Sequence, residues 1–589
     1  MKTITRKTAC TLAFLALAAP AGFALSSNMA LPYADKCSGP QTPVLAFYSK
    51  TSDDLLFNSS EPIDIMCQAG LRSVGLHWAL SRNTLFTPFR QGEAEALPPD
   101  KFRIRVETAG LLPGFYDLRV ALDSGTGKAT TGVCTFGYRA SEMPLAQTRP
   151  ADFKQFWDTA KAKLAKIPLD AQLGEMTTYT GDQINQYNLQ HAGLPGDYDP
   201  TGHVTDTVES CKVSFAGPDG GRVYAWLAKP KGNGPFPVML VLPGAGFNAR
   251  PRPLEHARHG YLALDVQVHG QDVDLPVPEY PKIPGYYGDW KFEPASDYYF
   301  YNIHLRVLQA VNYLASRPDA DLNRLVAAGG SQGGRLSLVI AGLDPRIRAI
   351  VPCIAHSANI PFSKWAEACN GSVFQPDGKR VVGPKSDGMS LTGAPPVADT
   401  PEMRCMAYYD TMNFAPDIHC PVMMNGGLVD GISPPSAVWG AYMRIGTTDK
   451  SITPLPGLGH DWSAEFDRRA WRWLDKVWAS QAATQAKWPA RPNTTPGPPI
   501  SCLEPGPVHT IPADRWVWRS YRALDIYGGA FPGPSFAGLT PARAITSRAF
   551  SPRGLQARNV TAWAEAKRRP RYTNQDHAKA CKAVTPDGE

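Results

Sequence analysis

The chain has 589 residues, of which 43% are hydrophobic and 19% are charged, and its formal net charge is +7. This length predicts two or three domains, and the apolar content is ample for real hydrophobic cores. The basic excess is concentrated beyond residue 482, and nothing in the sequence supports nucleic-acid recognition. We expect no nucleic-acid partner.

Residues 1–24 have the pattern of a secretory signal. A basic start that includes Lys2 and Arg6 is followed by the apolar run 12–17, and small residues at 22–24 suit a cleavage site. No later apolar run is long enough to span a bilayer. We therefore expect an exported protein, secreted or periplasmic.

Residues 25–140 show the alternation of short β-strands. Turn signals such as Pro113-Gly114 separate period-two apolar runs, which predicts a small β-sandwich-like domain. Once Cys10 is removed with the signal, the remaining cysteines are even in number, and an oxidising compartment would allow disulfide bonds. A Cys67–Cys134 bridge is the best single pairing. The domain could bind glycan, or it could serve only as a packing or spacer module.

Residues 141–482 alternate strand and helix patterns, which predicts an α/β fold with a doubly wound sheet. Within them, the apolar run 325–328 leads into Gly329-Gly330-Ser331-Gln332-Gly333-Gly334, and a second apolar run at 335–340 suits a buried helix. This is the order of a nucleophile elbow, in which a serine lies on a strained turn between strand and helix. We expect Ser331 to be the nucleophile of a hydrolase.

An acid and a base follow this serine in the order that an α/β hydrolase requires. Asp430 comes just after the core strand expected at 420–425, where α/β sheets place their sites. His460 lies in a glycine-flanked loop, before the closing helix expected at 465–478. We predict that His460 takes the proton from Ser331 and that Asp430 orients the imidazole.

These segments resemble the family of acetyl xylan esterases and cephalosporin C deacetylases among the carbohydrate esterases. The resemblance covers roughly residues 149–480. It implies an α/β-hydrolase serine esterase that removes acetyl groups from acetylated xylan or oligosaccharides. The segments that carry it are the opening helix at 149–157, the aromatic cluster at 297–301, the elbow at 329–334 and the acid loop at 428–436.

The oxyanion hole needs two backbone N–H donors. One is expected from Gln332, the residue after the nucleophile. The resemblance assigns the second to Phe247, in the loop after the strand at 236–242, where the family has a tyrosine between glycine and asparagine. Gly246 remains an alternative donor.

Two positions depart from the family pattern. His269 stands where the family often has an arginine, and it is either a structural replacement or a second histidine of the site. Asp461 follows the histidine where the family commonly has glutamate, which makes Asp461 a competitor for the role of the acid. No Cys-x-x-Cys pair occurs and no histidine interleaves with cysteines at zinc-ligand spacing, so we expect neither a metal nor a cofactor.

Residues 483–589 are expected to be a Pro-rich linker followed by a basic extension. The proline-rich stretch is 489–499, and Cys502 and Cys581 could tie the extension together. Its charge could hold anionic polymers or lipid headgroups, or it could form a solvated, poorly ordered tail.

Two other functions remain open at this point. A prolyl-oligopeptidase-like peptidase shares the elbow and the triad order, although residues 25–140 are too short for a propeller. A catalytically silent glycan-binding protein is the second alternative. The expected partner is an acetylated saccharide substrate, and a homo-oligomer is possible.

Overall fold

The structure is a computed structural model of the chain. All described residues fall in the first of two compact units, Met1–Gly533, and the second unit, Pro534–Glu589, lies outside them. The expected signal segment, the Pro-rich linker and the basic tail also lie outside the described residues. The described ranges are 45–70, 75–123, 129–191, 202–281, 287–369, 372–374, 380–382 and 393–484.

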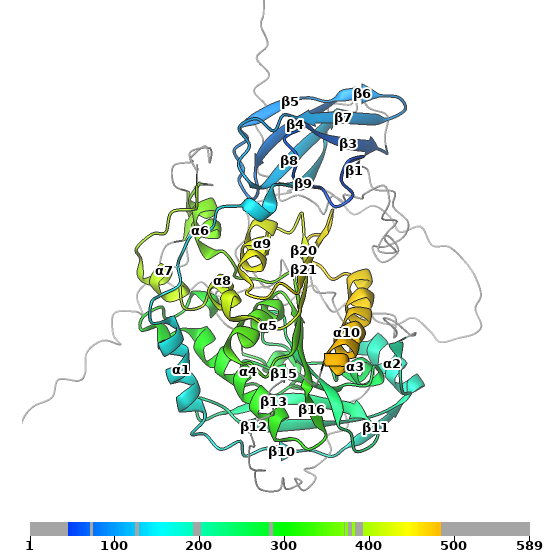
Figure 1. Cartoon of the computed structure of the whole chain (residues 1–589), viewed down its shortest axis with the longest axis vertical. Helices are drawn as coiled ribbons and strands as arrows, with labels where there is room; N and C mark the ends of the chain where they lie inside the picture. Colours follow the sequence, from blue (N-terminus) through cyan, green and yellow to red (C-terminus); the bar gives the residue numbers. More distant parts are fainter. Residues whose placement is uncertain are drawn as a thin grey trace, which may run out of the picture. The chain divides into compact units, whose positions relative to one another are not determined.

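The N-terminal strands form two sheets with a shared apolar core (Figure 1). Alternating inward side chains such as Phe47, Leu118 and Phe136 are almost completely buried, which is the pattern that the period-two runs predicted. The first sheet has the order β1 (Leu45–Tyr48), β3 (Ile63–Ala69), β7 (Lys101–Val106) and β6 (Glu95–Leu97). The second has the order β2 (Leu56–Phe57), β9 (Ala129–Tyr138), β8 (Gly114–Asp123), β4 (Gly75–Arg82) and β5 (Arg90–Glu93).

Cys67 and Cys134 lie in different sheets of this N-terminal region, on β3 and β9, and both are buried. Both are free thiols in the structure, so the expected bridge is not formed in it. Burial raises the pKa of the Cys67 thiol to about 12, because a thiolate would be poorly solvated there. The two thiols fill core space beside aromatic and aliphatic neighbours.

The second region is built on a ten-stranded mixed sheet. From β15 to β21 every described pairing is parallel, while β12 and β13 pair antiparallel at one edge. The order is β10 (Gln172–Leu173), β12 (Thr207–Ala216), β13 (Arg222–Pro230), β15 (Leu262–Gln267), β14 (Phe236–Leu242), β16 (Ala320–Gly330), β17 (Ala349–Cys353), β20 (Val422–Gly427) and β21 (Lys450–Leu455), with β11 (Thr177–Thr180) beside β12. A separate hairpin joins β18 (Ser372–Phe374) and β19 (Arg380–Val382).

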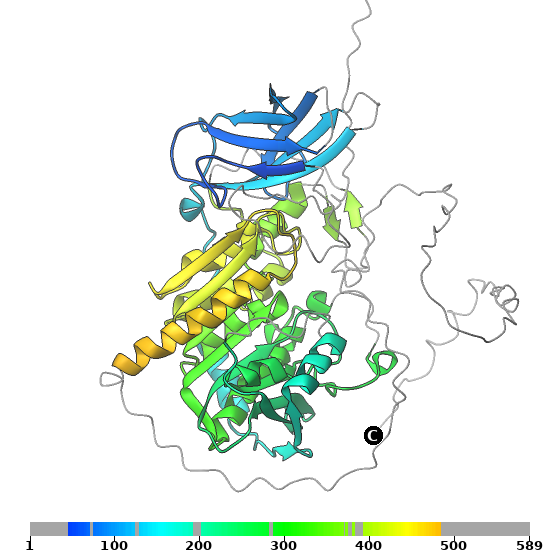
Figure 2. The same cartoon turned by 90° about the vertical axis from the view of Figure 1, so that its right-hand side faces the viewer.

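Helices cover both faces of this sheet, as Figure 1 and the perpendicular view in Figure 2 show. One face packs against α1 (Phe153–Leu164), α4 (Tyr299–Ser316), α5 (Gln332–Leu343), α8 (Thr411–Phe414) and α9 (Pro435–Arg444). The other face is covered by α3 (Leu254–Arg258) and α10 (Ala464–Thr484). The remaining helices are α2 (Gly181–His191), α6 (Ile360–Cys369) and α7 (Pro401–Met406). This layered arrangement confirms the predicted α/β fold class.

The closing helix α10 shows how the sequence specifies this packing. Phe466, Ala470, Leu474 and Val477 recur at spacings of three and four, so they share one helical face, and all four are buried against the sheet. No helix in the described part of the chain combines the length and the apolar character that crossing a bilayer requires.

The N-terminal sheets contact the α/β region through apolar and polar side chains within the same compact unit. The rings of Phe115 on β8 and Trp439 on α9 meet edge to face, with centroids 4.9 Å apart. The N–H group of Ser436 donates to Asn83 Oδ1 at 3.4 Å. Leu85 is buried in one cluster with Phe362 of α6. These contacts fix the β domain onto α6 and onto α9, the helix that follows the acid loop.

Candidate active site

The elbow serine lies on a strained turn between β16 and α5. Ser331 has φ 56° and ψ −116°, a conformation that side-chain-bearing residues rarely adopt. Its N–H group donates to the Cys353 carbonyl at 3.0 Å, which ties the turn to the neighbouring strand β17. The strain is therefore held in place by the sheet.

The glycines of the elbow are required by close backbone approach. A Cβ atom added at Gly329 would lie 2.4 Å from the carbonyl oxygen of Leu242, and one at Gly333 would lie 2.2 Å from the same oxygen. At Gly334 it would lie 2.5 Å from the Cys353 carbonyl oxygen. Contacts below 3.0 Å are not tolerated, so only glycine lets α5 start this close to strands β14 and β17.

The structure brings Ser331, Asp430 and His460 together. His460 Nε2 lies 2.9 Å from Ser331 Oγ, and His460 Nδ1 lies 2.8 Å from Asp430 Oδ2. The other carboxylate oxygen, Asp430 Oδ1, accepts the N–H groups of Ile432 and Ser433, each at 2.8 Å. The carboxylate is thus fully buried and fixed by its own loop after β20, while the imidazole remains slightly exposed, at 12% of its side-chain surface.

Asp461, the competitor for the acid, lies differently. Its carboxylate is exposed, and Asp461 Oδ1 accepts the N–H group of Trp462 at 2.7 Å. Asp461 therefore caps its own turn, while Asp430 is the carboxylate within hydrogen-bond distance of the imidazole. The close approach of the two loops depends on Gly427, where an added Cβ would lie 2.4 Å from the Leu458 carbonyl oxygen.

The predicted oxyanion donors lie at the start of α5 and in the loop after β14. The Gln332 side chain is buried, its Oε1 accepts the Tyr287 hydroxyl at 2.5 Å, and its Nε2 donates to the Gly244 carbonyl at 3.4 Å. The N–H group of Gly246, the alternative donor, is directed at the Tyr287 hydroxyl at 3.2 Å. Because the Gly246 N–H group already has this partner, Phe247 is the better candidate for the second oxyanion donor.

His269 is packed behind this loop. Its ring stacks on Phe247 with centroids 4.2 Å apart, and its Nδ1 lies 3.0 Å from the Tyr299 hydroxyl. Burial, together with the positive charges of Arg306 and Arg250, lowers the pKa of His269 to about 3. A neutral, enclosed imidazole supports the loop that carries Phe247, which agrees with the structural alternative for His269.

Sequence reasoning missed two side chains of this neighbourhood. Tyr287 has no local sequence signal that assigns it a partner, although its hydroxyl joins Gln332 to the loop after β14. His356 follows β17, the strand beside the elbow, and, besides burial, the charge of His460 is one of the causes that lower the pKa of His356. Its ring lies 2.6 Å from Ser357 Oγ, and burial lowers the pKa of His356 to about 3. Its place after a parallel strand was the available signal.

The fold and this arrangement define an α/β hydrolase, and comparison with known proteins shows which family the chain resembles. A family model described as acetyl xylan esterase (AXE1) matches residues 196–363 and 396–477. Among curated relatives, acetyl esterase Axe7A from Xylanibacter ruminicola is 29% identical over 376 residues, which cover 62% of this chain and 74% of that protein.

Two solved structures complete the comparison. The acetyl xylan esterase from Paenibacillus sp. R4 is 24% identical and covers 57% of this chain and 98% of that chain, with a TM-score of 0.43. Acetyl xylan esterase 1 from Thermoanaerobacterium sp. JW/SL YS485 is 21% identical and covers 57% and 97%, with a TM-score of 0.42. The family match and the curated relative confirm the resemblance to the acetyl xylan esterases, and the chain is a carboxylic ester hydrolase.

Proposed function

We propose that this chain is a serine esterase that removes acetyl groups from acetylated xylan or oligosaccharides through Ser331, His460 and Asp430. The observation that carries the proposal is the hydrogen-bonded series from Asp430 through His460 to Ser331 Oγ. A buried carboxylate, an imidazole and an elbow serine in this order are the parts that nucleophilic ester hydrolysis needs.

The proposed reaction has two stages. Ser331 Oγ attacks the ester carbonyl while His460 takes the hydroxyl proton, and the N–H groups of Gln332 and Phe247 stabilise the oxyanion. His460 then protonates the leaving sugar hydroxyl, which gives an acetyl-enzyme. A water molecule, deprotonated by His460, attacks this ester, releases acetate and restores Ser331.

We infer the acetyl group and the saccharide from the proteins to which this chain is similar. The matching family is described as acetyl xylan esterase, and the curated relative is named an acetyl esterase. We propose a secreted or periplasmic location, because residues 1–24 have the pattern of a secretory signal. The division at residues 140 and 482 is likewise our proposal for the domain boundaries.

A substrate panel tests the proposal. Wild-type protein and Ser331→Ala are assayed on acetylated xylo-oligosaccharides, on esters of longer acyl chains and on a proline-containing peptide. We expect acetate release by the wild type, a loss of about 10⁴-fold or more in kcat for Ser331→Ala, and no peptide cleavage.

The matched control is Ser337→Ala, on the same helix, where Ser337 Oγ donates to the Gly333 carbonyl. This variant should keep most of the activity. Acetate release by a folded Ser331→Ala protein would refute the mechanism. Peptide cleavage in preference to acetyl esters would refute the substrate class.

A further inference from the structure

Away from the triad, three side chains of types that bind metal ions converge beside α3. His203 precedes β12, Glu255 lies in α3, and His259 ends that helix. The ligand atoms of all three lie within 4.8 Å of one another. His203 Nε2 is 2.5 Å from Glu255 Oε1, and His259 Nε2 is 3.7 Å from the same oxygen. The spacing of four residues places Glu255 and His259 on one helical face.

The three side chains are buried, and Glu255 also has a hydrogen-bond partner outside the group. The side chains of His203, Glu255 and His259 are only 9%, 5% and 3% exposed. The other carboxylate oxygen, Glu255 Oε2, accepts the side-chain amide of Asn188 at 3.0 Å. Outer partners of this kind orient a metal ligand and are a regular feature of metal sites.

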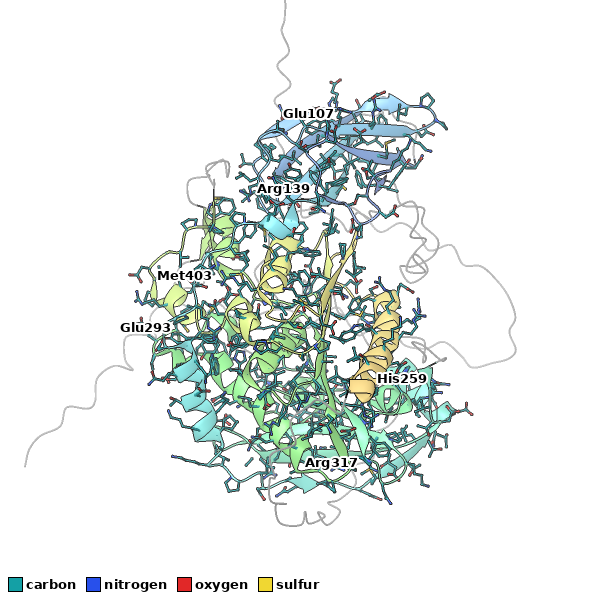
Figure 3. The ribbon with its side chains drawn as sticks, viewed as in Figure 1. Glu107, Arg139, His259, Glu293, Arg317 and Met403 are labelled. Atoms are coloured by element: carbon teal, nitrogen blue, oxygen red, sulfur yellow. The ribbon has the colours of Figure 1, made fainter. Side chains whose placement is uncertain are left out.

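His259 is positioned by tight packing on its ring. It stacks on Trp471 of α10 with centroids 4.0 Å apart and an interplanar angle of 6°. The backbone at Gly202 also lies against it, since an added Cβ there would be 2.5 Å from His259 Cε1. Figure 3 labels His259 next to α10. The plane of the imidazole is therefore fixed.

We propose that His203, Glu255 and His259 bind one Zn²⁺ ion. Two imidazole nitrogens and one carboxylate oxygen are donors that zinc takes at about 2.0–2.2 Å, so neighbouring ligand atoms in a tetrahedral site are about 3.3 Å apart. The separations of 2.5 Å and 3.7 Å lie on either side of that value. Side-chain shifts of less than about 1 Å would produce the site.

The ion takes the place of the proton shared between His203 Nε2 and Glu255 Oε1, which leaves to the solvent, and a water molecule completes the coordination. Zinc would tie the segment before β12 to α3, where His259 already contacts α10. We therefore expect bound zinc to stabilise the folded protein. The competing arrangement is a metal-free ion pair, in which His203 and Arg258, whose guanidinium lies 3.8 Å from Glu255 Oε2, neutralise the carboxylate.

The full-length protein is stripped with a chelator, equilibrated with Zn²⁺ and freed of excess ion, and its metal content is measured by mass spectrometry. We expect about one zinc per chain and a rise in Tm of several degrees, because an ion that binds only the folded state stabilises it. Wild-type protein that retains no zinc would overturn the proposal, and this result needs no variant.

Two variants locate the ion. Glu255→Gln and His259→Asn should lose the bound zinc and its effect on Tm. His256→Asn is the matched control, because His256 lies on the same helix and its ring meets the same Trp471 at 5.7 Å. This control should retain zinc. Equal zinc content in Glu255→Gln and wild type would place the ion elsewhere and overturn the assignment.

Discussion

At the residue scale, the acid and the base of the proposed mechanism are held in different ways. Asp430 is fixed by two N–H groups of its own loop and is buried, so its second oxygen faces His460 with little freedom. The His460 imidazole hydrogen-bonds to Asp430 and Ser331 and keeps 12% of its side-chain surface exposed. An imidazole that moves protons in both directions benefits from this looser support.

The first prediction concerns the acid. Asp430→Asn keeps the shape of the loop but favours the wrong tautomer of His460, so we expect kcat to fall by about 10³- to 10⁴-fold. Asp461→Asn is the matched control, since Asp461 is exposed and bonds to its own turn. Steady-state kinetics on a soluble acetyl ester measure kcat for both variants. A larger loss of kcat in Asp461→Asn than in Asp430→Asn would show that the acid is assigned wrongly.

The second prediction concerns Tyr287, whose hydroxyl donates to Gln332 and accepts the N–H group of Gly246. Tyr287→Phe removes both contacts and loosens the two segments that carry the proposed oxyanion donors. We expect kcat to fall by about tenfold with little change in KM, because the loss acts mainly on the transition state.

Tyr280→Phe is the control for this change, because the Tyr280 hydroxyl also donates within the protein, to the Asp272 carbonyl at 2.6 Å. If both variants lose the same activity, the effect is one of general packing and the positioning role of Tyr287 is wrong.

The difference between Ser331 and Tyr287 shows what sequence could reveal at this scale. The elbow has a local signal, since glycines adjoin the serine and an apolar strand precedes it. Tyr287 has no such signal, because its partner Gln332 is 45 positions away and the contact exists only once the sheet has formed. The sequence predicted that Asp430 and His460 would approach Ser331, and the structure places them there; their catalytic roles stay predictions.

At the element scale, the loop that carries His460 is supported by the first turn of α10. Asp467 in that turn accepts the indole N–H group of Trp462, two residues after His460. Burial raises the pKa of Asp467 to about 7, although Trp462 and the charge of Arg468 partly oppose this shift. A carboxyl group that titrates near neutral pH thus lies beneath the histidine loop.

The third prediction follows from this pKa. In the unfolded chain Asp467 ionises near pH 4, whereas in the folded protein it holds its proton to about pH 7. The folded state therefore binds more protons over this interval, and stability falls as the pH rises from about 4 to about 7.

Asp467→Asn removes this dependence, so the Tm of the variant relative to wild type should increase with pH, by about 3 °C or more across the interval. Asp475→Asn, an exposed change on the same helix, is the control. A constant Tm difference between Asp467→Asn and wild type from pH 4 to pH 8 would contradict the prediction.

Strands and helices with strong local patterns were the easiest elements to predict. The strand expected at 236–242 matches β14, and the closing helix expected at 465–478 lies within α10. The group of His203, Glu255 and His259 was not foreseen, because His203 lies 52 positions before Glu255 and no cysteine accompanies the three residues. A search for short zinc motifs does not detect donors that only the folded sheet brings together.

At the scale of the whole molecule, the N-terminal sheets contact α9, the helix that follows the acid loop. Phe115 meets Trp439 and Asn83 accepts from Ser436, and both partners belong to α9, which follows the loop of Asp430. The interface therefore supports the element that leads away from the proposed acid. The sequence predicted strands for residues 25–140, but their partner surface was not predictable because it depends on isolated aromatic residues.

The last prediction concerns the C-terminal segment, which lies outside the described residues. The face of the sheet beside β16 and β17 is already covered by α10, whose buried residues Phe466, Leu474 and Val477 all precede residue 485. A chain that ends after residue 484 should therefore keep kcat and KM on a small soluble acetyl ester within about twofold of the full-length values. Retention on an anionic surface, if the full-length protein shows it, should fall and should mimic the effect of high salt.

A second truncation provides the control for this experiment. A chain that ends after residue 470 lacks Leu474 and Val477, so it exposes the apolar face of the sheet and should fail to fold or lose several degrees of Tm. If the chain ending after residue 484 also unfolds, or loses most of its turnover on the soluble ester, the basic segment is part of the catalytic core. Cys502 or Cys581 would then be the first residues to examine as its anchors, because either could bond to a cysteine of the α/β region.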